Sequence, residues 1–153
     1  DIAFLGFGEM DQHGNVNVSK LAGNTVGPGG FIDIAQNART VVFCGTFDTS
    51  GASLEIGDGK LRIKAHGRIA KLVDEVAQIT FSGPQALAQG QRVIYITERA
   101  VFKLTADGVK LIEIAPGLDL YSDILDRMGF LPQMVAAPAK MDAAFFYENG
   151  VVV

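Results

Sequence analysis

The sequence contains a single cysteine and no tryptophan among its 153 residues. An internal disulfide is therefore impossible, and Cys44 lies in an apolar run where we expect it to be buried in a strand. No group of cysteine and histidine residues has the spacing of metal ligands, so no metal site is predicted. No apolar run approaches the ~18 residues that a transmembrane helix needs, so no membrane span is predicted either.

Basic residues are few and scattered. The chain carries 13 Lys and Arg against 17 Asp and Glu, which gives a formal net charge of −4 without any run of positive charge. This balance argues against a broad surface for nucleic acid. The first residues lack the basic region and cleavage pattern of a secretory signal, although a shortened start could conceal one. The simplest predicted location is the cytoplasm.

The composition is that of a packed domain. Hydrophobic residues make up 48% of the chain and charged residues 20%, which favours a packed core over disorder. A length of 153 residues suits one domain, so we predict a single domain over 1–153. After Gly129 the periodicity is weak and prolines recur. We therefore expect 130–153 to form an extended arm that packs on the domain or on a partner.

Three apolar segments have the pattern of strands that lie within a sheet. Residues 2–7, 40–47 and 92–97 are nearly continuous apolar runs, typical of buried strands. Residues 31–38 have apolar side chains at helical spacing and predict a short helix. Shorter alternating segments predict further strands at 16–18, 69–73 and 78–81.

Turn sequences separate two pairs of alternating segments. Gly57-Asp58-Gly59 lies between 53–56 and 60–63 and predicts a β-hairpin. A second hairpin is predicted from 100–104 and 109–114. Two capping residues predict helices: Ser82 for one that ends at Gly90, and Asp119 for one over 120–128. The whole pattern predicts a mixed α/β fold with more strand than helix, in which short helices link buried strands and hairpins lie at one edge.

The most informative segment begins at Gly14 and ends at Ile34. It has the pattern of a strand, a glycine-rich turn and the start of a helix. Gly29 and Gly30 have no side chains to prevent close approach, and their N–H groups lie at the expected helix start. Such N–H groups could bind an anion or a developing oxyanion. The alternative is a glycine turn that only links strand and helix.

The same segment resembles a known family. The resemblance is carried by Gly14-Asn15-Val16-Asn17-Val18-Ser19-Lys20 and by Val26-Gly27-Pro28-Gly29-Gly30-Phe31-Ile32-Asp33-Ile34, with further support from 41–47 and 95–102. These runs are similar to the C-terminal half of family I CoA-transferases, most closely those of the short-chain propionate and acetate type. The resemblance covers residue 2 to about residue 142, with a departure from the closest pattern at 21–26 and Pro28.

The resemblance implies both a fold and a reaction. The fold is the three-layer α/β arrangement shared with sugar-phosphate isomerase relatives (NagB/RpiA-like), here with added antiparallel β-hairpins. The reaction moves CoA from an acyl-CoA to a small carboxylate through a glutamyl-CoA thioester. CoA is then a substrate, and no permanently bound cofactor is expected.

The family's nucleophilic glutamate lies in a Glu-x-Gly-type motif upstream of the segment that this chain resembles. No catalytic nucleophile is therefore expected in this chain. We interpret the chain as the C-terminal part of a longer protein: a fragment, a processed product or one subunit of a split enzyme. Its predicted partner is the upstream half or N-terminal subunit of the same enzyme, in a homo- or hetero-oligomer.

Five residues are candidate substrate contacts under this resemblance. Gly29 and Gly30 would supply oxyanion donors. Asn15 and Asn17 could hydrogen-bond a carboxylate or orient the glutamate. The alternatives are a turn asparagine at 15 and a solvent-facing strand residue at 17. Phe31 could form a wall of the acyl pocket, or it could pack in the core.

Two further groups of polar residues favour a structural interpretation. Glu98 and Arg99 follow a strand end, where ligands bind in open α/β sheets, but an ion pair is favoured over a substrate role. Glu9 precedes a turn and should not be mistaken for the missing nucleophile.

Three functions stay open at this point. The chain could be part of a CoA-transferase, a non-catalytic scaffold or dimerisation module derived from that fold, or a relative that hydrolyses acyl-CoA. A Glu-x-Gly-type motif upstream in the parent gene would favour the first over the second. Product analysis, free acid against exchanged acyl-CoA, would separate the first from the third.

Overall fold

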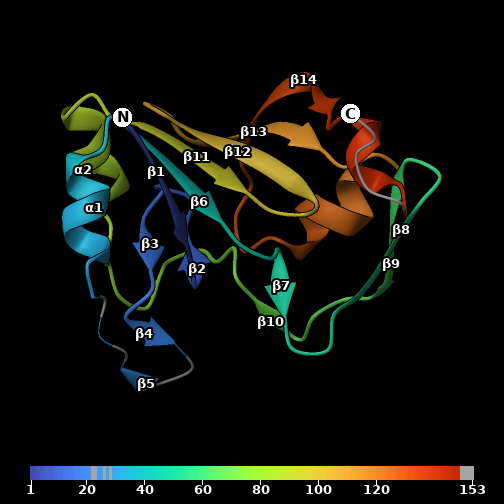
Figure 1. The fold of residues 1–153 in the computed structure, drawn as a ribbon, viewed down its shortest axis with the longest axis horizontal. Coiled ribbons are helices and arrows are strands. Elements are labelled where there is room, and N and C mark those ends of the chain that lie inside the picture. Colours follow the sequence, from blue (N-terminus) through green and yellow to red (C-terminus); the bar gives the residue numbers. More distant parts are fainter. Residues whose placement is uncertain (22–23, 26, 28, 149–153) are drawn as a thin grey trace.

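The computed structural model describes residues 1–21, 24–25, 27 and 29–148. Its centre is a six-stranded mixed sheet in the order β1-β6-β11-β12-β13-β14 (Figure 1). The first three are parallel neighbours: β1 (Ile2–Gly6), β6 (Thr40–Cys44) and β11 (Arg92–Ile96). The next two continue the sheet as the predicted antiparallel hairpin: β12 (Ala100–Thr105) and β13 (Gly108–Ile114).

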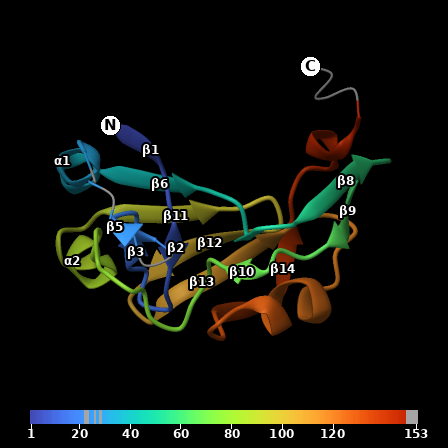
Figure 2. The same cartoon turned by 90° about the horizontal axis from the view of Figure 1, so that it is seen from below.

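Two short helices precede parallel strands of the sheet, as predicted. α1 (Phe31–Asn37) leads into β6, and α2 (Gly83–Ala88) leads into β11. Ser82 caps α2, because its hydroxyl accepts a hydrogen bond from the N–H of Gln85 at 3.3 Å. The helices lie side by side at one end of the sheet (Figures 1 and 2).

The main core centres on Phe43, near the carboxyl end of β6. Its ring stacks on Tyr95 at 5.5 Å between centroids and meets the edge of Phe81 at 5.0 Å. Phe31, the first residue of α1, lies 5.9 Å from the same ring. Burying one such aromatic side chain contributes roughly 1.5–3 kcal/mol to folding. These contacts hold the start of α1 near the carboxyl end of β6.

The first strand was predicted to be buried, and this prediction was wrong. β1 is an edge strand that pairs, among the described residues, with β6 only. Side chains on a strand alternate between the two faces of its sheet, so only half of them reach the core. Phe4 is 67% exposed and Ile2 is 55% exposed, because both point to the opposite face.

The prediction for Cys44 was wrong for the same reason. Phe43 occupies the core face of β6, so the next residue, Cys44, lies on the other face and is exposed. The prediction of which helix residues form the buried apolar face was also only partly correct. Phe31, Ala35 and Ala38 are buried, whereas Ile34 is about half exposed.

The predicted hairpin in the middle of the chain is confirmed as a separate two-stranded sheet. β8 (Ser53–Gly57) pairs with β9 (Lys60–Ala65) through a turn in which Asp58 and Gly59 have φ angles of 55° and 73°. Two left-handed residues give the turn the twist that suits tightly connected strands. Leu61 of β9 packs in a second, smaller core with Ala115 and Phe146. This part lies at the opposite end of the molecule from α1 and α2 (Figure 1).

Apart from β14, described below, the remaining strands are two residues long. They are β2 (Glu9–Met10), β3 (Val16–Asn17), β4 (Lys20–Leu21), β5 (Asn24–Thr25), β7 (Asp48–Thr49) and β10 (Ile69–Ala70). β2 pairs with β3, β4 with β5, and β7 with β10. The strand predicted at 78–81 is not formed, because the segment makes only an isolated bridge between Phe81 and Val16.

The C-terminal third differs from its prediction in detail. Asp119 caps a helical segment as expected, but the segment is a π-helical turn (Leu120–Ile124) followed by a 3-10 turn (Leu125–Arg127). Within the described part of the predicted arm, β14 (Gln133–Lys140) is a sheet strand parallel to β13, and Ala143–Phe146 form a 3-10 turn. Within the described residues, no helix is long and apolar enough to cross a membrane.

Candidate functional site

The three parallel strands end at one edge of the sheet, where the loops that follow them meet. The N–H of Gly45, after β6, donates to the carbonyl of Ile96 at the end of β11 at 3.0 Å. A Cβ at Gly45 would lie 2.7 Å from the Phe7 ring, after β1, and 3.0 Å from Nζ of Lys71. Glycine is thus required for this close approach. Open α/β sheets bind their ligands at this edge.

The predicted glycine loop leads into α1, whose first residue, Phe31, packs on Phe43 of β6. Gly29 has a φ of +57°, in the left-handed region that favours glycine. Gly30 has a φ of −78°, and its carbonyl accepts the N–H of Ile34 at 3.1 Å as α1 begins. Both glycines are exposed, and a Cβ at Gly29 would meet no atom of another described residue within 4 Å. The backbone here has the room that a ligand would need; Pro28 lies outside the described residues.

Phe31 follows this loop but does not line an open pocket. Its side chain is buried, and its ring packs on Phe43 in the main core. The observed contacts of Phe31 are thus those of a core residue. Its role as a wall of the acyl pocket stays a prediction. Phe31 anchors the first turn of α1, and with it the position of Gly29 and Gly30.

Asn17 is fully buried, so the alternative of a solvent-facing residue was wrong. Its amide nitrogen donates to Oε1 of Glu9 at 2.8 Å and to the carbonyl of Lys20 at 2.5 Å. Its Oδ1 accepts the N–H groups of Ser19 and Lys20 at 3.1 and 2.9 Å. The carboxylate that Asn17 binds is therefore one of this chain, and its side chain fixes the path of the backbone toward the glycine loop.

Asn15 has a similar set of internal partners. Its amide nitrogen donates to Oδ2 of Asp11 at 3.2 Å, and its Oδ1 accepts the N–H of Gly83 at 3.0 Å. These bonds join the turn after β2 to the start of α2. The substrate role predicted for both asparagines stays a prediction, whereas their observed bonds are structural.

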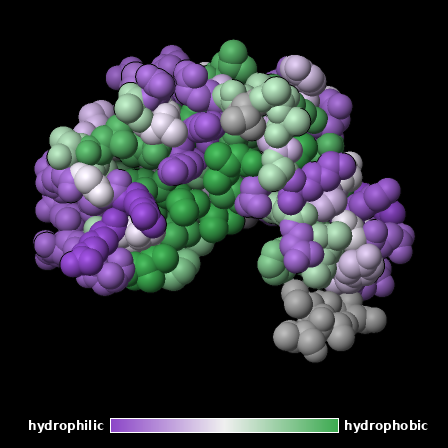
Figure 3. Space-filling model, turned by 90° about the horizontal axis from the view of Figure 1, so that it is seen from above, coloured by the Kyte–Doolittle hydropathy of each residue, from purple (hydrophilic) through white to green (hydrophobic). Residues whose placement is uncertain are grey.

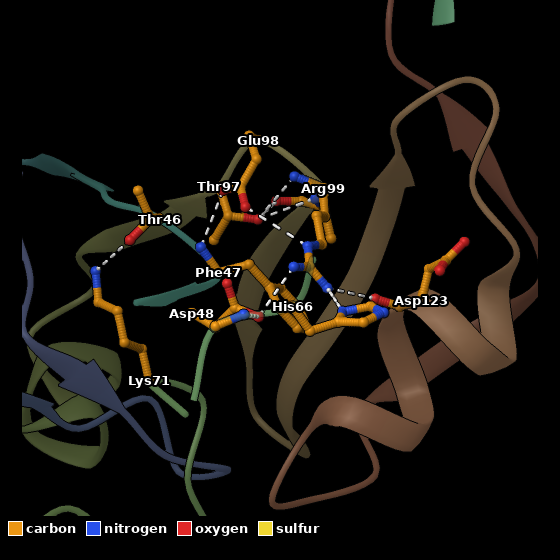
Figure 4. A network of polar contacts seen from close by, with 11 residues as sticks. Thr46, Phe47, Asp48, His66, Lys71, Thr97, Glu98, Arg99 and Asp123 are labelled. Atoms are coloured by element: carbon orange, nitrogen blue, oxygen red, sulfur yellow. Dashed lines mark hydrogen bonds and ion pairs between the residues drawn. The ribbon is translucent and has the colours of Figure 1, made fainter. Parts of the chain in front are cut away.

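A buried arginine organises the polar contacts next to this edge (Figure 4). The Nη2 atom of Arg99 lies 2.9 Å from Oδ2 of Asp48, and Nη1 donates to the carbonyl of Asp123 at 3.0 Å. The guanidinium also lies over the Phe47 ring, 4.6 Å from its centroid. The predicted ion pair with Glu98 is present at 3.6 Å but is longer than the pair with Asp48. Arg99 therefore ties the loop after β6 to the π-helical turn.

His66 completes this group from the segment before β10. Its Nδ1 lies 3.0 Å from Nη1 of Arg99. Because a guanidinium can only donate, Nδ1 must accept, and the proton of the neutral ring is on Nε2. Burial, followed by the charges of Arg127 and Arg99, lowers the pKa of His66.

Glu98 and Lys71 lie on the side of this group nearer to the strand ends (Figure 4). Oε2 of Glu98 accepts the N–H of Phe47 at 2.9 Å, which fixes the loop after β6. The Nζ of Lys71 lies 3.3 Å from the hydroxyl of Thr46 and 4.5 Å from the Phe7 ring centroid. Burial lowers the pKa of Lys71. Lys71 forms no ion pair with another described residue, so its charge is available to an anion at this edge.

The sequence did not point to Asp48, His66 or Lys71. Each lies in a segment without a motif. Asp48 and His66 both contact Arg99, whereas Lys71 contacts Thr46 in the loop after β6, and only the pairing of β7 with β10 brings their segments together. Glu98 and Arg99 were found because they directly follow a strand.

A hollow of about 140 Å³ between α1 and α2 has a different character. It is lined by residues such as Gln36, Gln85 and Gln91, and no charged side chain of the described residues borders it. It therefore offers no cation to a carboxylate or a phosphate. In the part of the chain that the structure describes, no group of His, Cys, Asp and Glu could hold a metal ion.

Known proteins similar to this chain are CoA-transferases. Acetate CoA-transferase YdiF of Escherichia coli O157:H7 is 50% identical over 148 residues, which cover 97% of this chain and 28% of that protein. Caffeate CoA-transferase of Acetobacterium woodii is 49% identical over 154 residues, which cover 97% of this chain and 29% of that protein. The chain is homologous to one region of these CoA-transferases. No protein-family model matches it.

Solved structures show the same similarity to CoA-transferases. The apoenzyme of the E. coli acyl-CoA transferase YdiF superposes with a TM-score of 0.94 at 50% identity, over 97% of this chain and 29% of that one. The structure of the same E. coli protein as a thioester complex with CoA superposes with a TM-score of 0.95. The expected α/β fold of the CoA-transferases and the resemblance to the family I enzymes are thus confirmed.

The chain spans less than a third of the length of the relatives that it matches. Glutaconate CoA-transferase of Acidaminococcus fermentans shares the fold at 18% identity and a TM-score of 0.67. The decarboxylase AibA/AibB shares it at 23% identity and a TM-score of 0.64. Since a decarboxylase has the same fold, the fold alone does not give the reaction.

Proposed function

We propose that this chain is part of an acyl-CoA:carboxylate CoA-transferase of the short-chain type. The observation that carries the proposal is the open backbone at Gly29 and Gly30, which leads into α1 in a chain about half identical to CoA-transferases. In this proposal the nucleophilic glutamate belongs to the rest of the same protein, which is the partner of this chain.

The proposed reaction gives the glycine loop a defined task. The glutamate carboxylate attacks the thioester carbonyl, whose oxygen becomes an oxyanion in the tetrahedral intermediate. The C–S bond then breaks, leaving an acyl-glutamyl anhydride and the CoA thiolate, which attacks the glutamyl carbonyl and releases the acid. N–H groups of Gly29 and Gly30 would hold the oxyanion, and one such donor is worth about 3 kcal/mol in the transition state.

The buried asparagines support this loop in the proposal. Asn17 holds the N–H groups of Ser19 and Lys20, which lie just before the loop. Asn15 joins Asp11 to the start of α2. A carboxylate is a weak nucleophile, so the geometry of its oxyanion donors must be fixed before the reaction begins.

The acyl group is proposed to be short, and a second candidate deserves the same test. The two relatives are named for acetate and for caffeate, an aliphatic and an aromatic acid, and this chain is 50% and 49% identical to them. Overall identity therefore does not separate the two acids. Phe31, buried in the core, offers no exposed ring to select between them.

The test is acyl exchange by the parent protein, followed by chromatography of the CoA esters. Propionyl-CoA is offered with acetate and, in parallel, with caffeate. We expect acetyl-CoA to form from acetate, and we expect the chain alone to form none, because it lacks the nucleophile. Preferential formation of caffeoyl-CoA would replace the short-chain assignment with the aromatic one. Release of free propionate without a new CoA ester would point to a hydrolase, and no reaction by a folded parent protein would favour a scaffold.

A further inference from the structure

Lys71 lies where the loops after the three parallel strands meet. Its Nζ is 4.5 Å from the centroid of the Phe7 ring, which directly follows β1, and 3.3 Å from the hydroxyl oxygen of Thr46, in the loop after β6 (Figure 4). A Cβ at Gly45 would lie 3.0 Å from the same nitrogen, and the N–H of Gly45 is bonded to the carbonyl of Ile96 at the end of β11. The ammonium group is therefore held at the carboxyl edge, where open α/β sheets bind their ligands.

The described residues leave the charge of Lys71 without an opposite charge in contact. An ammonium group has three donors, of which one is directed to the hydroxyl of Thr46, and none of the ion pairs of the described chain includes Lys71. The nearby carboxylates hold other groups: Glu98 accepts a backbone N–H, and Asp48 pairs with Arg99. Burial lowers the pKa of Lys71, and the charges of Glu98 and Asp48 oppose this effect without removing it. An anion against Nζ would supply the missing opposite charge.

Other parts of the described surface do not offer the same chemistry at this edge. Seen from above, apolar side chains gather in the middle of the molecule, and hydrophilic side chains lie mainly toward its two ends (Figure 3). Arg39 and Arg92 border a cleft at the amino ends of β6 and β11, which is the opposite edge of the sheet. Lys71 contacts the loop directly after β6, and Phe43 of the same strand packs on Phe31, the first residue of α1.

The surroundings of Lys71 favour a small anion with a single charge. Glu98 and Asp48 are close enough to act on its pKa, so they would repel a ligand with several negative charges. One ammonium group beside one alcohol matches one carboxylate: Nζ opposes its charge, and the hydroxyl of Thr46 can donate to its second oxygen. Because Lys71 is half-buried, the contact is screened less than it would be in water.

We propose that Lys71 binds a carboxylate group of the proposed reaction, with the hydroxyl of Thr46 as a second donor. Two carboxylates take part in that reaction: the acid that accepts CoA, and the nucleophilic glutamate in the rest of the protein. The inference rests on the proposed function for the source of the carboxylate, whereas the binding of a carboxylate at Lys71 does not require it.

Each source gives Lys71 a defined task. With the acceptor acid, Nζ holds one carboxylate oxygen while the other attacks the carbonyl of the glutamyl-CoA thioester. The C–S bond breaks and CoA leaves as the thiolate, which then attacks the acyl carbonyl of the anhydride, forms the new acyl-CoA and frees the glutamate. With the glutamate, Nζ holds the free carboxylate between turnovers and releases it when the uncharged thioester forms.

Labelling of Lys71 in the wild-type parent protein tests the binding directly. A trace of an amine-acylating reagent is added, and the modified fraction of the Lys71 peptide is measured by mass spectrometry. The free protein is compared with protein in acetate, in sodium chloride of the same ionic strength, and in its glutamyl-CoA form after reaction with propionyl-CoA. Acetate at ten times its dissociation constant should slow the labelling about tenfold, because only the unbound fraction reacts. Lys64 is the internal control, because it is exposed and pairs with Glu55.

The comparison also identifies the carboxylate. Slower labelling of Lys71 in acetate, with no change in chloride, identifies the acceptor acid. Faster labelling in the glutamyl-CoA form than in the free protein, with no effect of acetate, identifies the glutamate. Equal labelling in all of these samples would overturn the proposal, and so would protection by inorganic phosphate but not by acetate.

Lys71→Met removes the charge and keeps the length of the side chain. For the acceptor acid, the variant should raise KM for acetate about 10- to 100-fold, the effect of losing a hydrogen bond to a charged group, and leave the rate of glutamyl-CoA formation unchanged. For the glutamate, that rate should fall instead and KM for acetate should stay unchanged. Lys71→Arg keeps the charge and should recover part of the loss, and Lys64→Met should behave as the wild type.

A rise in KM for propionyl-CoA alone would assign Lys71 to the CoA phosphates and overturn the proposal. A lower melting temperature of Lys71→Met without either kinetic change would also overturn it, since it would show a structural role. If Lys71→Met does not fold, the labelling of the wild type decides. Acetate protection in a parent protein without acyl exchange would keep the site and reject the proposed function, whereas acyl exchange with equal labelling of Lys71 would do the reverse.

Discussion

Arg99 and Asp48 form a buried ion pair, with 2.9 Å between Nη2 and Oδ2, that joins the turn after β11 to the start of β7. The two residues are 51 positions apart in the sequence. Arg99 has no exposed surface, and the other oxygen of Asp48 has no hydrogen-bond partner among the described residues. The pair is thus incompletely satisfied, and its value lies in fixing two loops at the edge where the site is proposed.

Replacing Arg99 by Ala should strongly destabilise the protein. The change leaves the Asp48 carboxylate buried without its cation, and breaking such a pair costs about 3–5 kcal/mol. Urea unfolding of the wild type and the variant measures the difference. Arg62→Ala is the control, because its pairs with Glu55 and Asp58 are exposed and should contribute nothing measurable. Equal losses in the two variants would contradict the role of Arg99.

His66 should make stability depend on pH. Its pKa is lowered in the folded protein, from an ordinary value of 6.5, so below about pH 6.5 the unfolded chain binds a proton that the folded chain resists. The stability contributed by neutral His66 is complete above that pH and is lost as the pH falls toward the lowered value. His66→Asn keeps an acceptor for Arg99 but cannot titrate. The free energy of unfolding is measured at pH 8 and pH 5.5, and it should fall more on acidification in the wild type than in His66→Asn. Equal decreases in the two proteins would show that His66 is not the cause of the pH dependence.

Gly30→Val in the parent protein should abolish most transferase activity while the fold persists. The φ of −78° at Gly30 suits any residue, and among the described residues a Cβ would meet only the Ile34 side chain, at 3.8 Å. Its bulk would keep the thioester oxygen from the backbone, and loss of one oxyanion donor lowers kcat by about 100- to 1,000-fold.

Gly29→Val is the comparison for this experiment, because a valine at a φ of +57° is strained. Gly29→Val should therefore lower the melting temperature as well as the activity, whereas Gly30→Val should lower the activity alone. Circular dichroism and acyl exchange are measured on both. Near-normal turnover with Gly30→Val would remove this loop from the proposed mechanism.

Asn17→Ala should act mainly on stability. The substitution leaves the buried N–H of Ser19 and the part-buried N–H of Lys20 without their acceptor, and a buried unsatisfied group such as that of Ser19 costs about 1–3 kcal/mol. Asn37→Ala is the matched control, because the Asn37 amide makes one exposed bond, to the carbonyl of Asp33 at 2.8 Å. A stable Asn17→Ala protein with lost substrate affinity would instead support the predicted substrate contact.

Local sequence patterns determined most of the elements of this protein. The alternation on either side of Gly57-Asp58-Gly59 gave a hairpin because that turn demands left-handed residues, and Ser82 and Asp119 cap their helices through their own side chains. The resemblance in the glycine-rich segment also identified the CoA-transferases, which the similar proteins confirmed. These features depend on neighbours a few residues apart, so the sequence contains them directly.

Only the tertiary structure decided which face of each strand is buried and which polar residues meet. An apolar run such as 2–7 is compatible with a central or an edge strand, and only the pairing of β1 with β6 alone shows why Ile2 and Phe4 are exposed. Cys44 is exposed because Phe43 takes the core side. Arg99, Asp48 and His66 come from separate segments, and their contact depends on the pairing of β7 with β10. Long-range pairing sets these neighbours, and no local pattern encodes it.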